Sequence, residues 1–207
     1  MNLKQIRFLQ KQFLDGMKSM FSFTEEETDA MQNIIVFRVY KKGTILLEAG
    51  ELSTVSYTLI KGCLKSYYMI EGEETITAFY LENDTFSPSS VINKMPSVHY
   101  LACLEDCLVS VATPEMVQIM LDKFPRFEKI CRISAEEKLA GNQEVFEQFK
   151  TSSPEDRYLK LLETKPELFQ RIPQYLIASY LGMKPQSLSR IRQRIFIKQE
   201  YKSNLSY

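Results

Sequence analysis

The chain has 207 residues, of which 44% are hydrophobic and 25% are charged, with 26 basic and 26 acidic side chains. This composition predicts a folded globular protein of one large or two ordinary domains, and it excludes collagen-like, disordered and disulfide-scaffold classes. The sequence has no apolar run long enough to span a bilayer, and its first residues do not resemble a signal peptide. We therefore expect a cytoplasmic protein that makes no membrane contact.

Charge is unevenly distributed along the chain. The segment from Arg171 to Tyr207 contains seven basic residues and one acidic residue, a net charge of +6, so the preceding part carries −6. A basic end on an acidic body indicates a module that binds a polyanion.

The first 112 residues change from helical to strand-like patterning. Apolar residues at helical spacing up to about Ala30 predict short helices, and Thr24 with Glu27 fits a capping box. From Ile34 to Ala112, short β-branched and aromatic runs alternate with turns such as Lys61-Gly62 and Glu71-Gly72. These runs predict antiparallel hairpins that close into a β-roll or barrel.

The next segment predicts helices. Thr113 and Pro114 fit a helix start, and residues 126–150 predict one long helix with a ragged apolar stripe. That helix could lie across its own β-roll or pair with a second copy of itself. A polar break at residues 151–154 predicts a domain boundary. We therefore divide the chain into residues 1–125, 126–150 and 151–207.

Residues 174–194 have the spacing of a helix-turn-helix, QYLIASYLGMKPQSLSRIRQR. Ala178 allows two helices to cross closely, and Gly182 can adopt the left-handed conformation that ends the first helix. Leu188 and Ile191 continue the apolar period into the second helix, which Pro185 begins.

The outward face of the second predicted helix suits DNA recognition. Arginine can pair with guanine and glutamine with adenine, so this face is expected to read base edges. The candidate base contacts are Gln186, Arg190, Gln193, Ser187 and Ser189, with Arg190 foremost. The candidate phosphate contacts are Arg171, Lys184, Arg192 and Arg194.

These features together resemble the Crp/Fnr family of bacterial transcription regulators. The likeness rests on ELFQRIPQYLIASYLGMKPQSLSRIRQR, similar to the family's winged helix-turn-helix, and on YKKGTILLEAGELSTVSYTLIKGCLKSYY, similar to its cyclic-nucleotide-binding-like domain. It implies an α+β fold: an N-terminal antiparallel β-roll with flanking helices, a long connecting helix and a C-terminal winged helix-turn-helix. It also implies a homodimer through the long helix, at Phe127, Ile130, Phe146 and Phe149.

The effector region departs from the family pattern. Members that bind cyclic AMP carry a Gly-Glu pair after a phenylalanine and an arginine some ten residues later, whereas here Ser87-Pro88 follow Phe86 and Ser97 or Val98 replaces the arginine. We therefore do not expect cyclic AMP to be the effector, whose identity stays open. The candidate pocket residues are Phe86, Ser87, Ser89, Ser90, Lys94 and His99.

The chain is predicted to carry no cofactor or metal. Its four cysteines, Cys63, Cys103, Cys107 and Cys131, are scattered and interpreted as core residues, and a single histidine does not make a haem or cupin-like metal site. The sequence therefore favours a regulator that binds pseudo-palindromic double-stranded DNA over an enzyme. RNA polymerase is a further candidate partner. The alternative is a β-roll module whose basic C-terminal domain binds a non-DNA acidic partner.

Overall fold

The computed structural model describes the backbone of residues 1–204 and the side chains of residues 1–197. The chain divides into two compact units, Met1–Met69 with Thr77–Leu139, and Ile70–Ile76 with Ala140–Tyr207. The sequence-based division at residues 125 and 150 treated the long helix as a separate part. The boundary between the two compact units lies instead within that helix, after Leu139.

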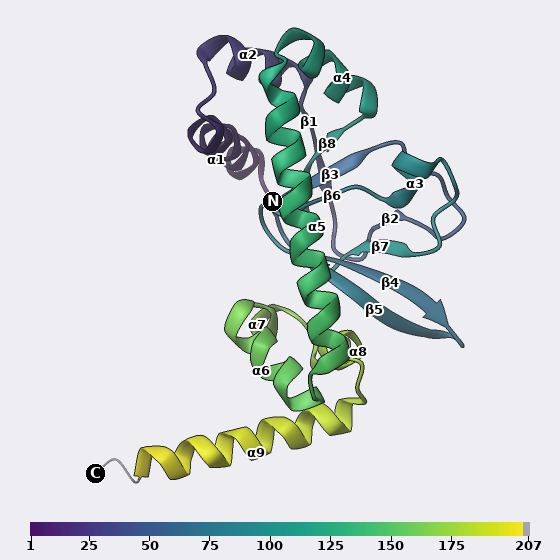
Figure 1. Cartoon of the computed structure of the whole chain (residues 1–207), viewed down its shortest axis with the longest axis vertical. Helices are drawn as coiled ribbons and strands as arrows, with labels where there is room; N and C mark the ends of the chain where they lie inside the picture. Colours follow the sequence, from purple (N-terminus) through teal and green to yellow (C-terminus); the bar gives the residue numbers. More distant parts are fainter. Residues whose placement is uncertain (205–207) are drawn as a thin grey trace. The chain divides into compact units, whose positions relative to one another are not determined.

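The first unit is built on an antiparallel β-roll, as the hairpin pattern predicted (Figure 1). One sheet has the order β1-β8-β3-β6 and the other β2-β7-β4-β5. In the first sheet, Val36 pairs with Val111 and Tyr57 with Phe86; in the second, Leu64 pairs with Cys103. The strands are β1 (Val36–Tyr40), β2 (Ile45–Leu47), β3 (Ser56–Lys61), β4 (Leu64–Ile70), β5 (Glu73–Tyr80), β6 (Thr85–Phe86), β7 (Tyr100–Cys103) and β8 (Cys107–Ala112).

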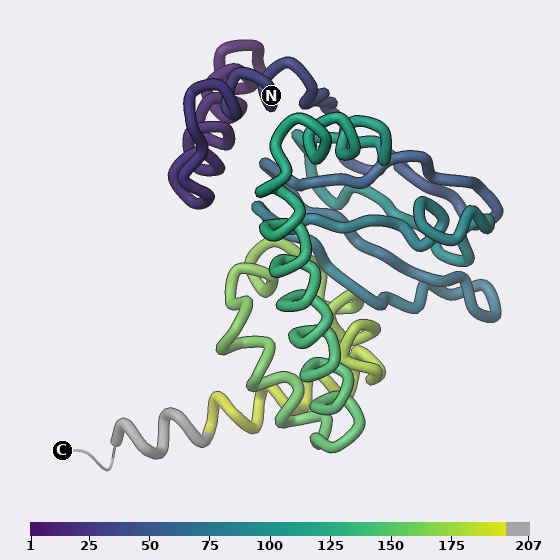
Figure 2. The backbone as a smooth tube through the Cα atoms, turned by 45° about the horizontal axis from the view of Figure 1, so that its top comes forward, coloured from purple at the N-terminus to yellow at the C-terminus, as the bar shows by residue number. Residues whose placement is uncertain are grey.

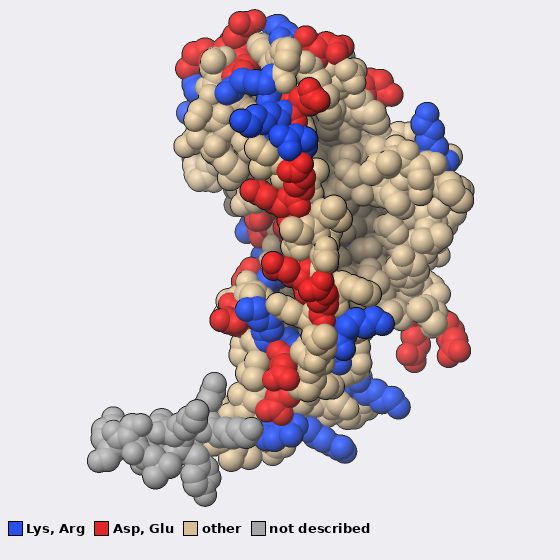
Figure 3. Space-filling view, in the orientation of Figure 1, with Lys and Arg blue, Asp and Glu red and all other residues tan. Residues whose placement is uncertain are grey.

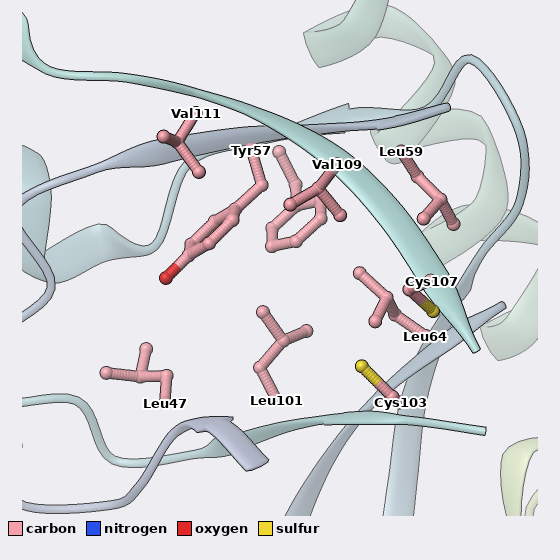
Figure 4. Close-up of a cluster of buried hydrophobic side chains, with 10 residues drawn as sticks. Leu47, Tyr57, Leu59, Leu64, Leu101, Cys103, Cys107, Val109 and Val111 are labelled. Carbon is pink, nitrogen blue, oxygen red and sulfur yellow. The ribbon is translucent and has the colours of Figure 1, made fainter. Parts of the chain in front are cut away.

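The two sheets enclose an apolar core. Leu101 lies at its centre with Leu64 and Val109 around it, and the sulfur atoms of Cys103 and Cys107 lie beside Leu64 (Figure 4). Gly62 turns the chain between β3 and β4 with φ +112°, and a Cβ atom there would lie 2.7 Å from Cys107 Sγ. This turn therefore requires glycine, as the Lys61-Gly62 pair predicted.

The helices that precede the β-roll strands in the chain and those that follow them pack around a second apolar cluster. Figure 2 shows the path of the chain through these helices. They are α1 (Leu3–Phe21), α2 (Glu25–Ile34), α4 (Pro114–Lys123) and the start of α5 (Arg126–Thr151), while α3 (Ser89–Asn93) lies within the roll. Thr24 and Glu27 form the expected capping box at the start of α2. The expectation of only short helices was wrong for α1, which runs for 19 residues and packs one face on β3.

The second unit contains the remaining helices. They are the rest of α5, α6 (Pro154–Thr164), α7 (Leu168–Arg171), α8 (Gln174–Tyr180) and α9 (Pro185–Asn204). Within this unit, Ser179 of α8 accepts a hydrogen bond from the Ile76 amide and donates one to the Glu74 carbonyl, each at 3.0 Å. Between Pro114 and Asn204 every regular element is a helix, so the described residues contain the helix-turn-helix without a β-hairpin wing. Residues 195–204 contain no glycine or proline that would end α9.

Candidate nucleic-acid interface and effector pocket

Helices α8 and α9 form the helix-turn-helix that the sequence predicted. Ala178 is fully buried where the helices meet, and Leu188 and Ile191 are buried on the inner face of α9. Gly182 adopts φ +67° in the turn, and the Met183 amide donates to the Ala178 carbonyl at 3.0 Å. Buried side chains on both helices therefore hold α9 against α8 and determine which face of α9 points outward.

The outward face of α9 carries the candidate base contacts. Gln186, Arg190 and Gln193 are exposed and follow one another at helical spacing, with Ser187 and Ser189 exposed on either side. Arg190 and Gln193 line one shallow hollow. Lys and Arg side chains gather around the first turns of this helix (Figure 3).

The candidate phosphate contacts differ in their surroundings. Lys184 is exposed in the turn before α9, whereas Arg171 and Arg192 are half-buried. Arg194 forms an ion pair with Glu155 of α6 at 3.3 Å, which ties α9 to α6. Lys184 is thus the residue of this set that is most open to a phosphate group.

Sequence reasoning missed a contact that supports the turn. The Phe149 ring lies against Gly182, where a Cβ atom would be 3.1 Å from Phe149 Cζ. The Arg157 guanidinium lies over the same ring at 4.4 Å. Phe149 and Arg157 are far from Gly182 in sequence, so no local motif indicates that the three residues meet.

Two residues that we assigned to a dimer contact belong to the core of their own chain. Phe127 is buried and stacks on Phe23 with ring centroids 4.8 Å apart, and Ile130 packs against the same cluster. Because intrachain contacts already cover Phe127, its assignment to a dimer surface was wrong. Phe146 and Phe149 are exposed farther along α5, and the other exposed apolar side chains there are Ile133, Leu139 and Val145.

A cavity of about 230 Å³ lies in the β-roll at the region that we predicted for an effector. Of the predicted residues, Phe86, Ser87 and His99 line it, but Ser89, Ser90 and Lys94 do not. The Ser90 hydroxyl is buried and accepts a hydrogen bond from the Ser53 amide at 3.2 Å, and Ser89 and Lys94 are exposed on and after the short helix α3. The other lining residues, which sequence reasoning missed, are Ser66, Tyr68, Thr77, Tyr80, Pro88 and Leu101.

The cavity is polar but uncharged. None of its lining residues is Lys, Arg, Asp or Glu. Burial lowers the pKa of His99, which favours the neutral imidazole, and burial raises the pKa of Tyr80. Ser97, one of the two residues that could replace the arginine of the family pattern, is buried and donates to the His99 carbonyl at 2.8 Å.

The cysteines do not form a metal site. Cys63, Cys103 and Cys107 are buried, in agreement with their interpretation as core residues, whereas Cys131 is exposed. The hydrogen bond that the Cys103 thiol donates to Cys107, together with burial, raises the pKa of Cys103. In the described part of the chain, no group of three or more His, Cys, Asp or Glu side chains could hold a metal ion. No helix in that part is long and apolar enough to cross a bilayer.

The β-roll and the helix-turn-helix together are typical of a class of two-part DNA-binding regulators. Residues 37–124 match the cyclic nucleotide-binding domain family. The fumarate and nitrate reduction regulatory protein of Vibrio cholerae is 29% identical over 189 residues, covering 84% of this chain and 74% of that protein. The anaerobic regulatory protein of Haemophilus influenzae is 24% identical over 188 residues, which cover 84% of this chain and 72% of that protein.

A solved structure has the same fold. FixK2 from Bradyrhizobium japonicum superposes with a TM-score of 0.65 at 16% identity, covering 80% of this chain and 86% of that chain. The chain is thus similar to regulatory proteins over most of its length, contains a match to the cyclic nucleotide-binding domain, and has the fold of FixK2.

Proposed function

We propose that the chain is a homodimeric, sequence-specific DNA-binding transcription regulator whose β-roll is a sensor domain. The observation that carries this proposal is the exposed row of Gln186, Arg190 and Gln193 on a helix held by buried Leu188 and Ile191. Arginine and glutamine can each make two hydrogen bonds to one base in the major groove. A surface row of these side chains on a rigid helix supports base recognition.

The remaining basic side chains would hold the protein on the DNA backbone. Lys184 at the start of α9 is the principal phosphate contact, with Arg171, Arg192 and Arg194 around it. Their contacts would position α9 without reading sequence. Glu155 holds Arg194 in an ion pair, so Arg194 would have to leave that partner or reach a phosphate beside it.

The homodimer would form through the exposed apolar side chains of α5. Leu139 and Phe146 are 70% and 61% exposed, and they are seven residues apart, as in the repeat of a helix pair. Two recognition helices in successive major grooves require half-sites about 34–36 Å apart, so the operator would be pseudo-palindromic.

The relatives named above are regulatory proteins, which favours a regulator over an enzyme and over a module for a non-DNA acidic partner. A DNA-binding regulator would act in the cytoplasm, with RNA polymerase as a further partner.

Selection of bound sequences from a random duplex pool tests this function. The proposal expects enrichment of a site with dyad symmetry and an affinity that falls steeply with salt concentration. Enrichment of sites without dyad symmetry would contradict the dimeric geometry, and an absence of any salt-dependent DNA binding would contradict the function itself.

A further inference from the structure

We propose that the β-roll cavity binds a small uncharged ring compound through hydroxyl groups and discriminates against anionic ligands. This inference rests on the proposed function, in which the β-roll is the sensor domain, and it names the chemical class of the effector. The cavity is defined above by its nine lining residues.

Hydroxyl groups reach the cavity from different parts of the β-roll. Ser66 and Thr77 stand on the neighbouring strands β4 and β5, and Thr77 Oγ1 lies 3.4 Å from Ser66 Oγ. Ser87 follows β6, and its Oγ lies 2.6 Å from Ser56 Oγ. The hydroxyl-bearing lining residues are Ser66, Tyr68, Thr77, Tyr80 and Ser87. Hydroxyls donate and accept, so this set can satisfy the polar groups of a neutral ligand.

Aromatic and apolar side chains supply the remaining walls. The rings of Tyr80 and Phe86 stack with centroids 4.2 Å apart, and Leu101 is almost fully buried beside them. The ring of Tyr68 lies 6.0 Å from that of His99. Flat ring faces interspersed with hydroxyls suit a ring compound that carries several hydrogen-bonding groups.

The cavity has no partner for a negative charge. Its nine lining residues include no Lys or Arg, and Lys94, which we had considered as a cation for this site, does not line it. Moving a phosphate or carboxylate from water into such a lining incurs a desolvation cost that no opposite charge offsets. A neutral ligand avoids that cost and keeps the same hydrogen bonds.

Matched pairs of probes test the inference on the full chain. We would compare nicotinamide with nicotinate, adenosine with AMP, and glucose with glucose 6-phosphate by ligand-observed saturation-transfer NMR. The inference predicts that at least one neutral member binds and that its anionic counterpart binds about tenfold more weakly or not at all. Binding of an anion as tightly as its neutral counterpart, or of no neutral member at millimolar concentration, would overturn it.

Three variants locate the binding. Thr77→Val removes a cavity hydroxyl at nearly constant shape and should weaken binding of the neutral probe severalfold. Thr58→Val is the matched control, because Thr58 bonds to Thr85 at 2.9 Å on the other sheet, outside the cavity lining. Ser87→Arg adds a cation at an exposed lining position and should shift the preference toward the anionic member. An equal effect of the two valine substitutions would contradict binding in this cavity.

DNA binding of the same preparations, measured without probe, separates this inference from the proposed function. If wild-type protein binds DNA but fails the probe test, only the ligand class is overturned. If neutral probes bind in the cavity but no DNA binds, the ligand class stands and the regulatory function fails.

Discussion

Phe149 at the end of α5 packs against Gly182 in the turn before α9, at a distance that is tight for any side chain on residue 182. A Cβ atom there would lie 3.1 Å from Phe149 Cζ, and Arg157 lies over the same ring. The end of the long helix thus contacts the turn that precedes α9. Glycine at residue 182 eases this close approach and adopts the positive φ without strain.

Gly182→Ala should lower the free energy of unfolding more than Gly43→Ala does. Both glycines have positive φ, +67° and +84°, and a Cβ in that conformation costs about 1–2 kcal/mol. Only Gly182 has a neighbour within 4 Å, so its variant adds a steric cost to the backbone strain. Urea denaturation of both variants measures the difference, and equal losses would contradict the packing of Phe149 on this turn.

Glu27→Gln should destabilise the first unit. Glu27 is buried and accepts hydrogen bonds from Arg126 Nε and Nη2 at 2.5 and 2.7 Å, which joins α2 to the start of α5. The matched control is Glu26→Gln, because Glu26 is exposed and pairs with Lys123 at 3.3 Å. Thermal unfolding should show a clear decrease in Tm for Glu27→Gln and little change for the control. A similar change in both would mean that the Arg126 pair does not stabilise the fold.

The Glu27 ion pair also predicts a pH dependence. The hydrogen bond from Arg126 lowers the pKa of Glu27 below its ordinary value of 4.5. The pKa of Glu27 is lower in the folded protein than in the unfolded chain. The ion pair therefore stabilises the fold at pH values above the ordinary pKa, and this contribution is lost as the pH falls through the folded-state pKa. Stability of the wild type should therefore fall more steeply than that of Glu27→Gln as the pH drops below about 4.5. Parallel curves of stability against pH for the two proteins would contradict a lowered pKa of Glu27.

Phe146→Glu should dissociate the proposed homodimer without unfolding the chain. Phe146 is exposed on α5, and a carboxylate there would be buried against its partner copy. Ile119→Glu is the control, since Ile119 is also exposed but lies on α4. Analytical ultracentrifugation should give a monomer for Phe146→Glu and a dimer for the control. A dimer in both cases would place the contact elsewhere.

The helix-turn-helix could be predicted because its determinants are close together in sequence. Ala178, Gly182, Leu188 and Ile191 all lie within fourteen residues, and each has a local reason for its position. The turn glycine marks the end of the first helix, and the apolar period identifies the buried face of the second helix. The opposite face of the second helix is therefore the exposed one. The hairpins of the β-roll were predictable for the same reason, from strand alternation and turn residues.

The cavity could be predicted only in part because its walls come from strands far apart in the chain. Phe86 and His99 lie in the segment that the family pattern singles out, whereas Ser66 and Thr77 enter through sheet pairing. Similarly, the apolar stripe of α5 did not reveal that Phe127 packs against Phe23 from the N-terminal helices. Contacts of this kind depend on how the elements pack together, which local patterns do not encode.

The most direct test of the central claim compares Arg190→Ala with Lys184→Ala on the selected operator and on its single-base variants. If α9 reads bases through Arg190, Arg190→Ala should cost about 1–3 kcal/mol on the operator and lose discrimination at one base position. Lys184→Ala should weaken binding to all sequences similarly and reduce the salt dependence. Unchanged base discrimination in Arg190→Ala, with only a uniform loss of affinity, would contradict the assignment of Arg190 to base recognition.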